Sequence, residues 1–86
     1  MIHELKTWPM YFERLADGSK TFEIRKDDRG YQTGDELRLR EWDPNSGYTG
    51  RSLQFRVGFV AKGDLFGLSL GGHAVLSLLP LTEETP

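Results

Sequence analysis

The sequence predicts an α+β domain that is mostly β, a small pseudo-barrel of about five strands with one main helix. Two observations support this prediction. Short segments of alternating apolar and polar residues recur along the 86-residue chain, separated by clusters of turn-forming residues. One early segment instead has its apolar residues at helical spacing. A chain of this length forms one small domain, which we expect to span residues 1–81, followed by a frayed tail at 82–86.

The first elements are a strand and the helix. Residues 2–6 alternate as a strand does. Pro9 suits the first turn of a helix, where its missing backbone N–H costs nothing. Gly18 follows the helical segment at a position where helices commonly end. Trp8 is expected to pack the start of the helix into the core, although a ring here can also stack on a base. The apolar stripe of the helix consists of Tyr11, Phe12, Leu15 and Ala16.

Residues 18–25 predict a turn that runs into a strand at 21–25, and this segment carries three charged groups. Side chains of a half-buried strand alternate between two faces, and we expect Phe22 and Ile24 to point into the core. Glu23 and Arg25 then lie together on the opposite face, with Lys20 at the mouth of the turn. An ammonium, a carboxylate and a guanidinium so close together predict a polar pocket. The alternative is an ordinary solvated face, whose ion pairs contribute only about 0.5 kcal/mol each.

A hairpin and a last strand complete the predicted sheet. Residues 36–42 alternate as a strand and residues 43–47 are dense in turn formers. The outward face of the first arm carries Arg38, Arg40 and Trp42. The second arm covers residues 52–60, with inward side chains Leu53, Phe55, Val57 and Phe59. Residues 63–72 hold four glycines without a clean period, which predicts a flexible loop or a short helical turn. Residues 73–79 form an apolar run typical of a strand covered on both sides.

Composition excludes several classes of protein. The chain has no cysteine, so it has no disulfide and no thiolate site. His3 and His73 lie far apart, and we expect no metal ion and no cofactor. Without a secretory signal, or an apolar run near the roughly 20 residues of a membrane span, we expect a cytoplasmic protein without a membrane partner. The net charge of -2 argues against binding nucleic acid through bulk charge, but all eleven Lys and Arg residues fall between Lys6 and Lys62, which favours a local basic face.

The motifs resemble a known family. ASCH domains of the PUA-like superfamily carry a Gly-x-Lys-x-x-Glu-x-Arg run directly after their first helix. The matching residues here are Gly18, Lys20, Glu23 and Arg25. The wider pattern is similar to a small uncharacterised bacterial and phage branch, which opens His-x-Leu-Lys-x-x-Pro-x-Tyr-Phe. That opening is matched by His3, Leu5, Lys6, Pro9, Tyr11 and Phe12, and later motifs by Gly34, Asp35 and residues 47–51.

The resemblance covers nearly the whole chain and implies a PUA-like pseudo-barrel with a cleft beside the helix that binds RNA or a nucleotide-like ligand. Similar bacterial amidohydrolases deacetylate acetylcytidine with the lysine equivalent to Lys20, which is the candidate catalytic residue if this chain is an enzyme. They have threonine where this chain has Glu23, and they use a further glutamate, for which Glu41 is the only candidate in a strand. Because Glu23 would stabilise the Lys20 ammonium, the residues favour binding over catalysis, and whether the chain is an enzyme stays open.

Three function classes therefore follow from the sequence. The first is a binding module in which Lys20 and Arg25 hold a phosphate or carbonyl edge and Glu23 accepts from an exocyclic amine. Aromatic rings at element ends, Tyr31 among them, would stack on unpaired bases at about 1–3 kcal/mol per base. The second class is a hydrolase of an acylated nucleoside, and the third is a protein-binding domain that uses residues 63–72. The candidate ligand-binding residues are Lys20, Glu23, Arg25, Arg38, Arg40, Trp42, Tyr48 and Arg51.

Overall fold

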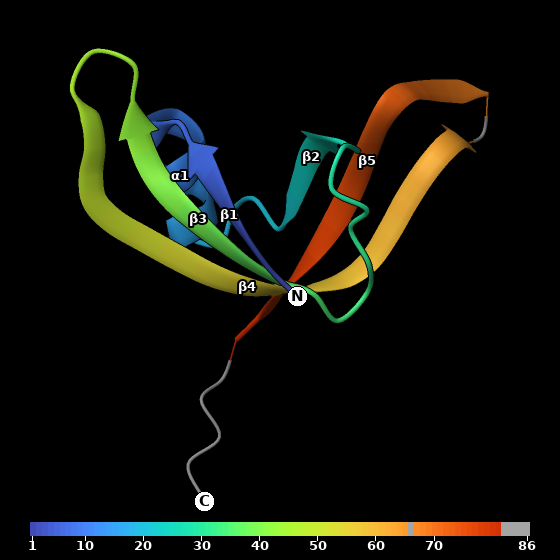
Figure 1. The fold of residues 1–86 in the computed structure, drawn as a ribbon, viewed down its shortest axis with the longest axis horizontal. Coiled ribbons are helices and arrows are strands. Elements are labelled where there is room, and N and C mark those ends of the chain that lie inside the picture. Colours follow the sequence, from blue (N-terminus) through green and yellow to red (C-terminus); the bar gives the residue numbers. More distant parts are fainter. Residues whose placement is uncertain (66, 82–86) are drawn as a thin grey trace, which may run out of the picture.

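The computed structural model describes residues 1–65 and 67–81, which form one five-stranded sheet and one helix (Figure 1). The elements are β1 (Ile2–Thr7), α1 (Pro9–Ala16), β2 (Phe22–Lys26), β3 (Glu36–Asp43), β4 (Gly47–Leu65) and β5 (Leu68–Pro80). The predicted α+β, mostly β class is confirmed. The predicted tail at 82–86 lies outside the described residues. Within the described residues, no helix has the length and apolar character to cross a membrane.

The sheet is curled, and its two edges are linked by a side chain. The strand order is β1-β3-β4-β5-β2, with β1 parallel to β3 and the other pairs antiparallel. Figure 1 shows β4 curving beneath both halves, with β1, β3 and α1 on one side and β2 and β5 on the other. The edge strands do not pair with each other. Instead, Arg25 on β2 donates from Nη2 to the main-chain oxygen of Lys6 on β1 at 2.9 Å.

The core lies on the inner face of the curled sheet. Leu37 and Leu39 of β3 are fully buried, as their alternation predicts. Leu15 of α1 packs against this cluster, while Pro9 begins the helix and Gly18, with a φ of 85°, follows its end. The buried cluster consists of Leu5, Leu15, Tyr31, Leu37, Leu39, Val57, Ala74, Leu76 and Leu78.

A β-bulge in β4 overturns the inward placement predicted for Phe59. The pairing of β4 with β5 shifts register between Val57 and Val60. Phe59 is therefore 67% exposed, and Val60 packs against the core in its place. The main-chain N–H of Phe59 donates to Ser77 Oγ at 2.8 Å, so a side chain satisfies the donor that the bulge removes from the ladder.

The chain beyond the bulge is a long ribbon. The loop or helical turn expected at 63–72 is wrong for the described residues, because 63–65 end β4 and 68–72 begin β5. Gly71 and Gly72 have φ values of 59° and 81°, so these glycines bend a strand without ending it. The strand at 73–79 is buried on one face only. Its inner residues are buried, whereas His73 and Leu79 are exposed.

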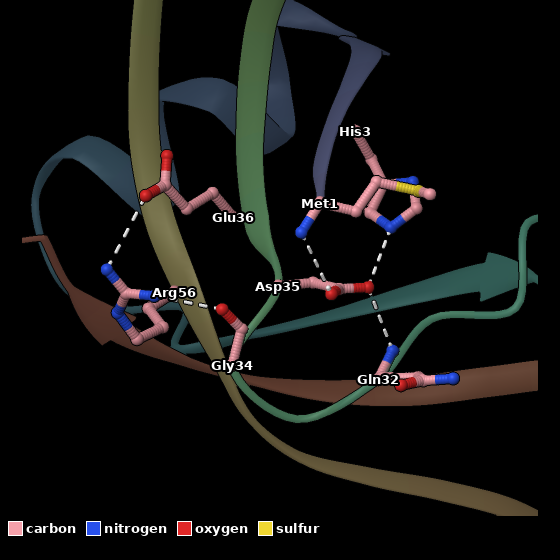
Figure 2. A network of polar contacts seen from close by, with 7 residues as sticks. All are labelled: Met1, His3, Gln32, Gly34, Asp35, Glu36 and Arg56. Carbon is pink, nitrogen blue, oxygen red and sulfur yellow. Dashed lines mark hydrogen bonds and ion pairs between the residues drawn. The ribbon is translucent and has the colours of Figure 1, made fainter.

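A polar network joins the start of β1 to the start of β3 (Figure 2). The carboxylate of Asp35 accepts from His3 Nε2 at 2.8 Å and from the main-chain N–H of Gln32 at 3.0 Å. The Met1 amine lies 3.4 Å from the same carboxylate. His3 is buried and contacts the edge of the Tyr31 ring, with the ring centroids 4.8 Å apart. The hydrogen bond from His3, followed by that from Gln32, holds the pKa of Asp35 below its usual range against the opposing effect of burial.

Acid should therefore destabilise the protein through Asp35. A carboxyl group whose pKa is lowered by folding stabilises the fold above its unfolded pKa of about 3.9, and that contribution disappears as the pH falls through the lower folded value. We expect urea unfolding to show the wild type more stable than Asp35→Asn at about pH 5, and this advantage to shrink toward about pH 2. An advantage that stays constant over this range would contradict the assignment.

Candidate functional site

The side chains of β2 point to the opposite faces of the sheet from those predicted. Glu23 lies opposite Leu76 of β5 and Arg25 opposite Ala74, and both partners are fully buried. Residues paired across antiparallel strands share a face, so Glu23 and Arg25 lie on the inner face of the sheet. Glu23 is only 4% exposed, whereas Ile24 on the outer face is 55% exposed. The predicted alternation of side chains along β2 is correct, but the face that carries Glu23 and Arg25 is the inward one.

Two cations compensate the buried carboxylate. Lys20 Nζ donates to Glu23 Oε1 at 2.8 Å, and Arg25 Nε donates to Glu23 Oε2 at 2.7 Å. Lys20 also donates to the main-chain oxygen of Phe22 at 2.6 Å, and Arg25 Nη2 donates to Thr7 Oγ1 at 3.2 Å. We call Lys20, Glu23 and Arg25 the charged triad. Each carboxylate oxygen accepts from its own cation, which is how a buried charge is tolerated.

The charged triad forms the floor of an open cleft of about 650 Å³, which we call the β2 cleft. The cleft lies along the free edge of β2, where the sheet does not close, and it extends to the end of β1 and the first turn of α1. Its apolar walls are Trp8, Met10, Tyr11, Phe22 and Ile24, and Lys6 and Thr7 complete the lining. All five wall residues are exposed, although they are large and apolar. An exposed apolar surface around convergent polar groups is typical of a ligand site.

The arrangement offers hydrogen-bond donors beneath aromatic rings. Lys20 Nζ lies 5.6 Å from the centroid of the Tyr11 ring and 4.8 Å from that of Phe22. Lys20 has a third N–H beyond its two hydrogen bonds, and within residues 1–65 and 67–81 Arg25 Nη1 has no hydrogen-bond partner. A flat ligand with polar edges fits these groups, because its faces can stack while its edge accepts hydrogen bonds. The described residues contain no group of three His, Asp or Glu side chains placed to hold a metal ion.

Other predicted site residues lie on the outer face of β1, β3 and β4. Arg40 Nη1 donates to Glu4 at 3.1 Å, and its guanidinium lies 3.8 Å from the centroid of the Tyr48 ring. The Lys6 ammonium lies 4.6 Å from the centroid of the Trp42 ring. Trp42 and Tyr48 therefore each carry a cation on one ring face. Arg38 also pairs with Glu4, at 3.5 Å.

Arg51 and Tyr31 lie elsewhere. Arg51 donates to Glu13 of α1 at 2.7 Å, and this hydrogen bond raises the pKa of Arg51. Arg51 does not line the β2 cleft. Tyr31 was expected to be available for stacking, but it is buried in the core, and this burial raises the pKa of its phenol. Glu41 is buried beside Thr7 in the β1–β3 register and accepts from Thr49 Oγ1 at 2.7 Å. It does not line the β2 cleft.

Sequence reasoning missed the apolar walls. Trp8 was expected to pack into the core, but it is 53% exposed and faces the β2 cleft. Trp8 immediately precedes α1 and Tyr11 lies in its first turn, three residues later, so both rings lie at the same end of the helix. That spacing was the available signal. Nothing in the alternation of β2 could indicate that Phe22 and Ile24 would line a cleft at a sheet edge.

Comparison with known proteins identifies a family and a relative. Residues 2–78 match the family described as a domain of unknown function, DUF3850. An Escherichia phage P2 protein, described as an uncharacterized 12.9 kDa protein in the GpA 3′ region, is 43% identical to this chain over 85 residues. The alignment covers 96% of this chain and 77% of the phage protein. This relative agrees with the predicted similarity to a small phage branch.

Proposed function

The chain belongs to the DUF3850 family, and we propose that it is a binding module for a nucleotide, free or within an RNA strand, whose base enters the β2 cleft. The observation that carries the proposal is the position of the charged triad beneath exposed aromatic walls. Aromatic side chains stack on the faces of bases, and cationic donors with a carboxylate acceptor can hydrogen-bond to the edge of a base.

Each group has a defined role in this proposal. Trp8 and Tyr11 stack on the faces of the base, as aromatic side chains do in single-strand binding proteins. The remaining N–H groups of Lys20 and Arg25 donate to a carbonyl or phosphate oxygen. Glu23 accepts from an exocyclic amine with the lone pairs that its two cations leave unused. A base with an amine beside a carbonyl or ring acceptor, as in cytosine, matches this pattern.

The motif at residues 18–25 supports the same proposal, because its similarity to ASCH domains of the PUA-like superfamily implies RNA or nucleotide ligands. On this proposal the protein acts in the cytoplasm. An amidohydrolase acting on an acylated nucleoside is the alternative. The contacts of Lys20 weigh against it, because the Lys20 amine, which would have to act as the catalytic group, already donates hydrogen bonds to a carbonyl and to a carboxylate.

Binding can be followed through Trp8. The chain has two tryptophans, so Trp42→Phe leaves Trp8 as the only one. We expect nucleoside monophosphates to change its fluorescence on titration. Lys20→Ala in this background should weaken binding by roughly tenfold or more, the value of a hydrogen bond to a charged group. Acetylcytidine in the same panel, assayed for deacetylation, tests the alternative.

Lys62→Ala is the matched control, because Lys62 pairs with Asp27 at 3.0 Å and lies outside the β2 cleft. It should bind as the Trp42→Phe protein does. Circular dichroism spectra must show that each variant is folded. The proposal fails if no nucleotide changes the fluorescence, or if Lys20→Ala and Lys62→Ala bind equally well. Turnover of acetylcytidine that is lost in Lys20→Ala would establish the enzyme instead.

A further inference from the structure

A second hollow adjoins the β2 cleft and shares two of its lining residues. This hollow of about 330 Å³ lies beside the free edge of β1, and we call it the β1 groove. Its lining residues are Glu4, Leu5, Lys6, Arg25, Arg29 and Tyr48. Lys6 and Arg25 line both hollows, so the β1 groove begins where the β2 cleft ends.

The β1 groove is basic, although the whole chain has a net charge of -2. Three of its lining side chains, Lys6, Arg25 and Arg29, are cationic, and Glu4 is the single carboxylate among them. Glu4 is already paired with Arg40 at 3.1 Å and with Arg38 at 3.5 Å. The charge of Glu4 is thus compensated from outside the groove, and the charge of Arg25 is compensated by Glu23, so the excess positive charge of the lining comes from Lys6 and Arg29.

The cations are held in place before any ligand arrives. Arg29 Nη1 donates to the main-chain oxygen of Glu4 at 3.2 Å, and Arg25 holds that of Lys6. Both arginines therefore satisfy carbonyl groups on the free edge of β1, two residues apart along the strand. The Lys6 ammonium lies over the Trp42 ring. Because these side chains are already ordered, little conformational entropy is lost when they bind an anion.

We propose that the β1 groove binds the phosphodiester backbone next to a base held in the β2 cleft. The natural ligand is then a single-stranded oligonucleotide, not a free nucleotide. This inference rests on the proposed function, because it takes the base in the β2 cleft as its starting point. Cations spaced along a strand edge follow a backbone of regularly spaced phosphates, and each contact that is made releases a counterion.

Fluorescence anisotropy with labelled hexanucleotides, as RNA and as DNA of the same sequence, tests the groove. We expect Arg29→Ala to weaken hexanucleotide binding by about fivefold, the upper end for one exposed ion pair. The slope of log affinity against log salt should become shallower by about 0.7, the value for one phosphate contact on a single strand. Nucleoside monophosphate binding, measured through Trp8 fluorescence, should be unchanged.

Two further variants sharpen the test. Among the described residues Glu4 is the one carboxylate that lines the groove, and Glu4→Gln removes it and frees Arg38 and Arg40, so this substitution should strengthen hexanucleotide binding. Arg14→Ala removes the same charge as Arg29→Ala, but Arg14 is exposed on α1 and pairs with Asp17 at 3.6 Å, so hexanucleotide binding should change little. We expect Arg29→Ala to weaken hexanucleotide binding and Glu4→Gln to strengthen it. If Arg14→Ala, which changes the net charge as Arg29→Ala does, leaves the affinity near that of the wild type, the effect belongs to the groove and not to the net charge of the protein.

The outcomes distinguish this inference from the proposed function. If mononucleotides bind but neither hexanucleotide binds more tightly, or if Arg29→Ala and Arg14→Ala behave alike, the groove assignment is wrong while the base site stands. If no mononucleotide or hexanucleotide binds at all, both proposals fail. If only one of the RNA and DNA hexamers binds and responds to Arg29→Ala, the groove is supported and its ligand is identified.

Discussion

Replacing Glu23 by glutamine should destabilise the domain by about 3 kcal/mol and abolish ligand binding. The substitution leaves the Lys20 and Arg25 cations side by side without a compensating charge, and the new amide group turns two donors toward one of them. Breaking a buried ion pair typically costs about 3–5 kcal/mol, and we expect the low end because both cations keep partial contact with solvent. Urea unfolding at neutral pH measures the change.

Glu36→Gln is the control for this substitution. Glu36 is also on the sheet and pairs with Arg56 at 3.5 Å, but both side chains are partly exposed. Exposed pairs contribute little, so its free energy of unfolding should change by less than about 1 kcal/mol. If Glu23→Gln were as mild as Glu36→Gln, the ion pairs of the charged triad would contribute no more than an exposed pair does, which would contradict the account of Glu23 as a buried, compensated carboxylate.

Replacing Leu39 by alanine should destabilise the fold by about 2–5 kcal/mol, the range for a buried leucine truncated to alanine. Leu39 lies on the central part of β3, opposite Leu5 of β1 and Leu53 of β4, and is fully buried. A chain of 86 residues has a thin core, so it cannot redistribute the loss widely. Such a loss is a large part of the roughly 5–15 kcal/mol by which domains are stable.

Leu79→Ala is the matched control, because Leu79 is 50% exposed on the outer face of β5. Its unfolding midpoint in urea should remain near that of the wild type. Equal effects of the two substitutions would mean that β3 does not run through the centre of the core.

The sequence was most informative where a single physical pattern decided the structure. Proline and glycine marked the two ends of α1, and alternation identified β3 with Leu37 and Leu39 inward. The turn formers after Trp42 correctly placed the hairpin between β3 and β4. In each of these segments the local preference and the tertiary fold agree.

The errors have physical reasons of their own. Alternation separates two faces of a strand but does not say which of them is inward, and in β2 the buried face is charged because the charged triad compensates itself. The bulge before Val60 reverses the alternation after Val57, which exposes Phe59. Tyr31 lies in a polar segment, and only the fold places it against His3.

The candidate site was predictable in part. The motif at residues 18–25 identified the charged triad, which the fold brings together as one cluster. The residues predicted on β3 lie on the outer face of the sheet, where Arg40 pairs with Glu4, and Arg51 forms an ion pair with the helix. The walls of the β2 cleft depend on how the sheet curls and where it stays open, which no local pattern encodes.

The central claim is that a base binds in the β2 cleft, and nuclear magnetic resonance of the ¹⁵N-labelled domain tests it most directly. On titration with a panel of ribonucleotides, we expect shifts of the Trp8 indole N–H and of the amides of residues 20–25. With short RNA, we expect the amides of residues 4–6 to shift as well. Shifts confined to other regions, such as the β4–β5 ribbon, or no shifts with any ligand of the panel, would contradict the account.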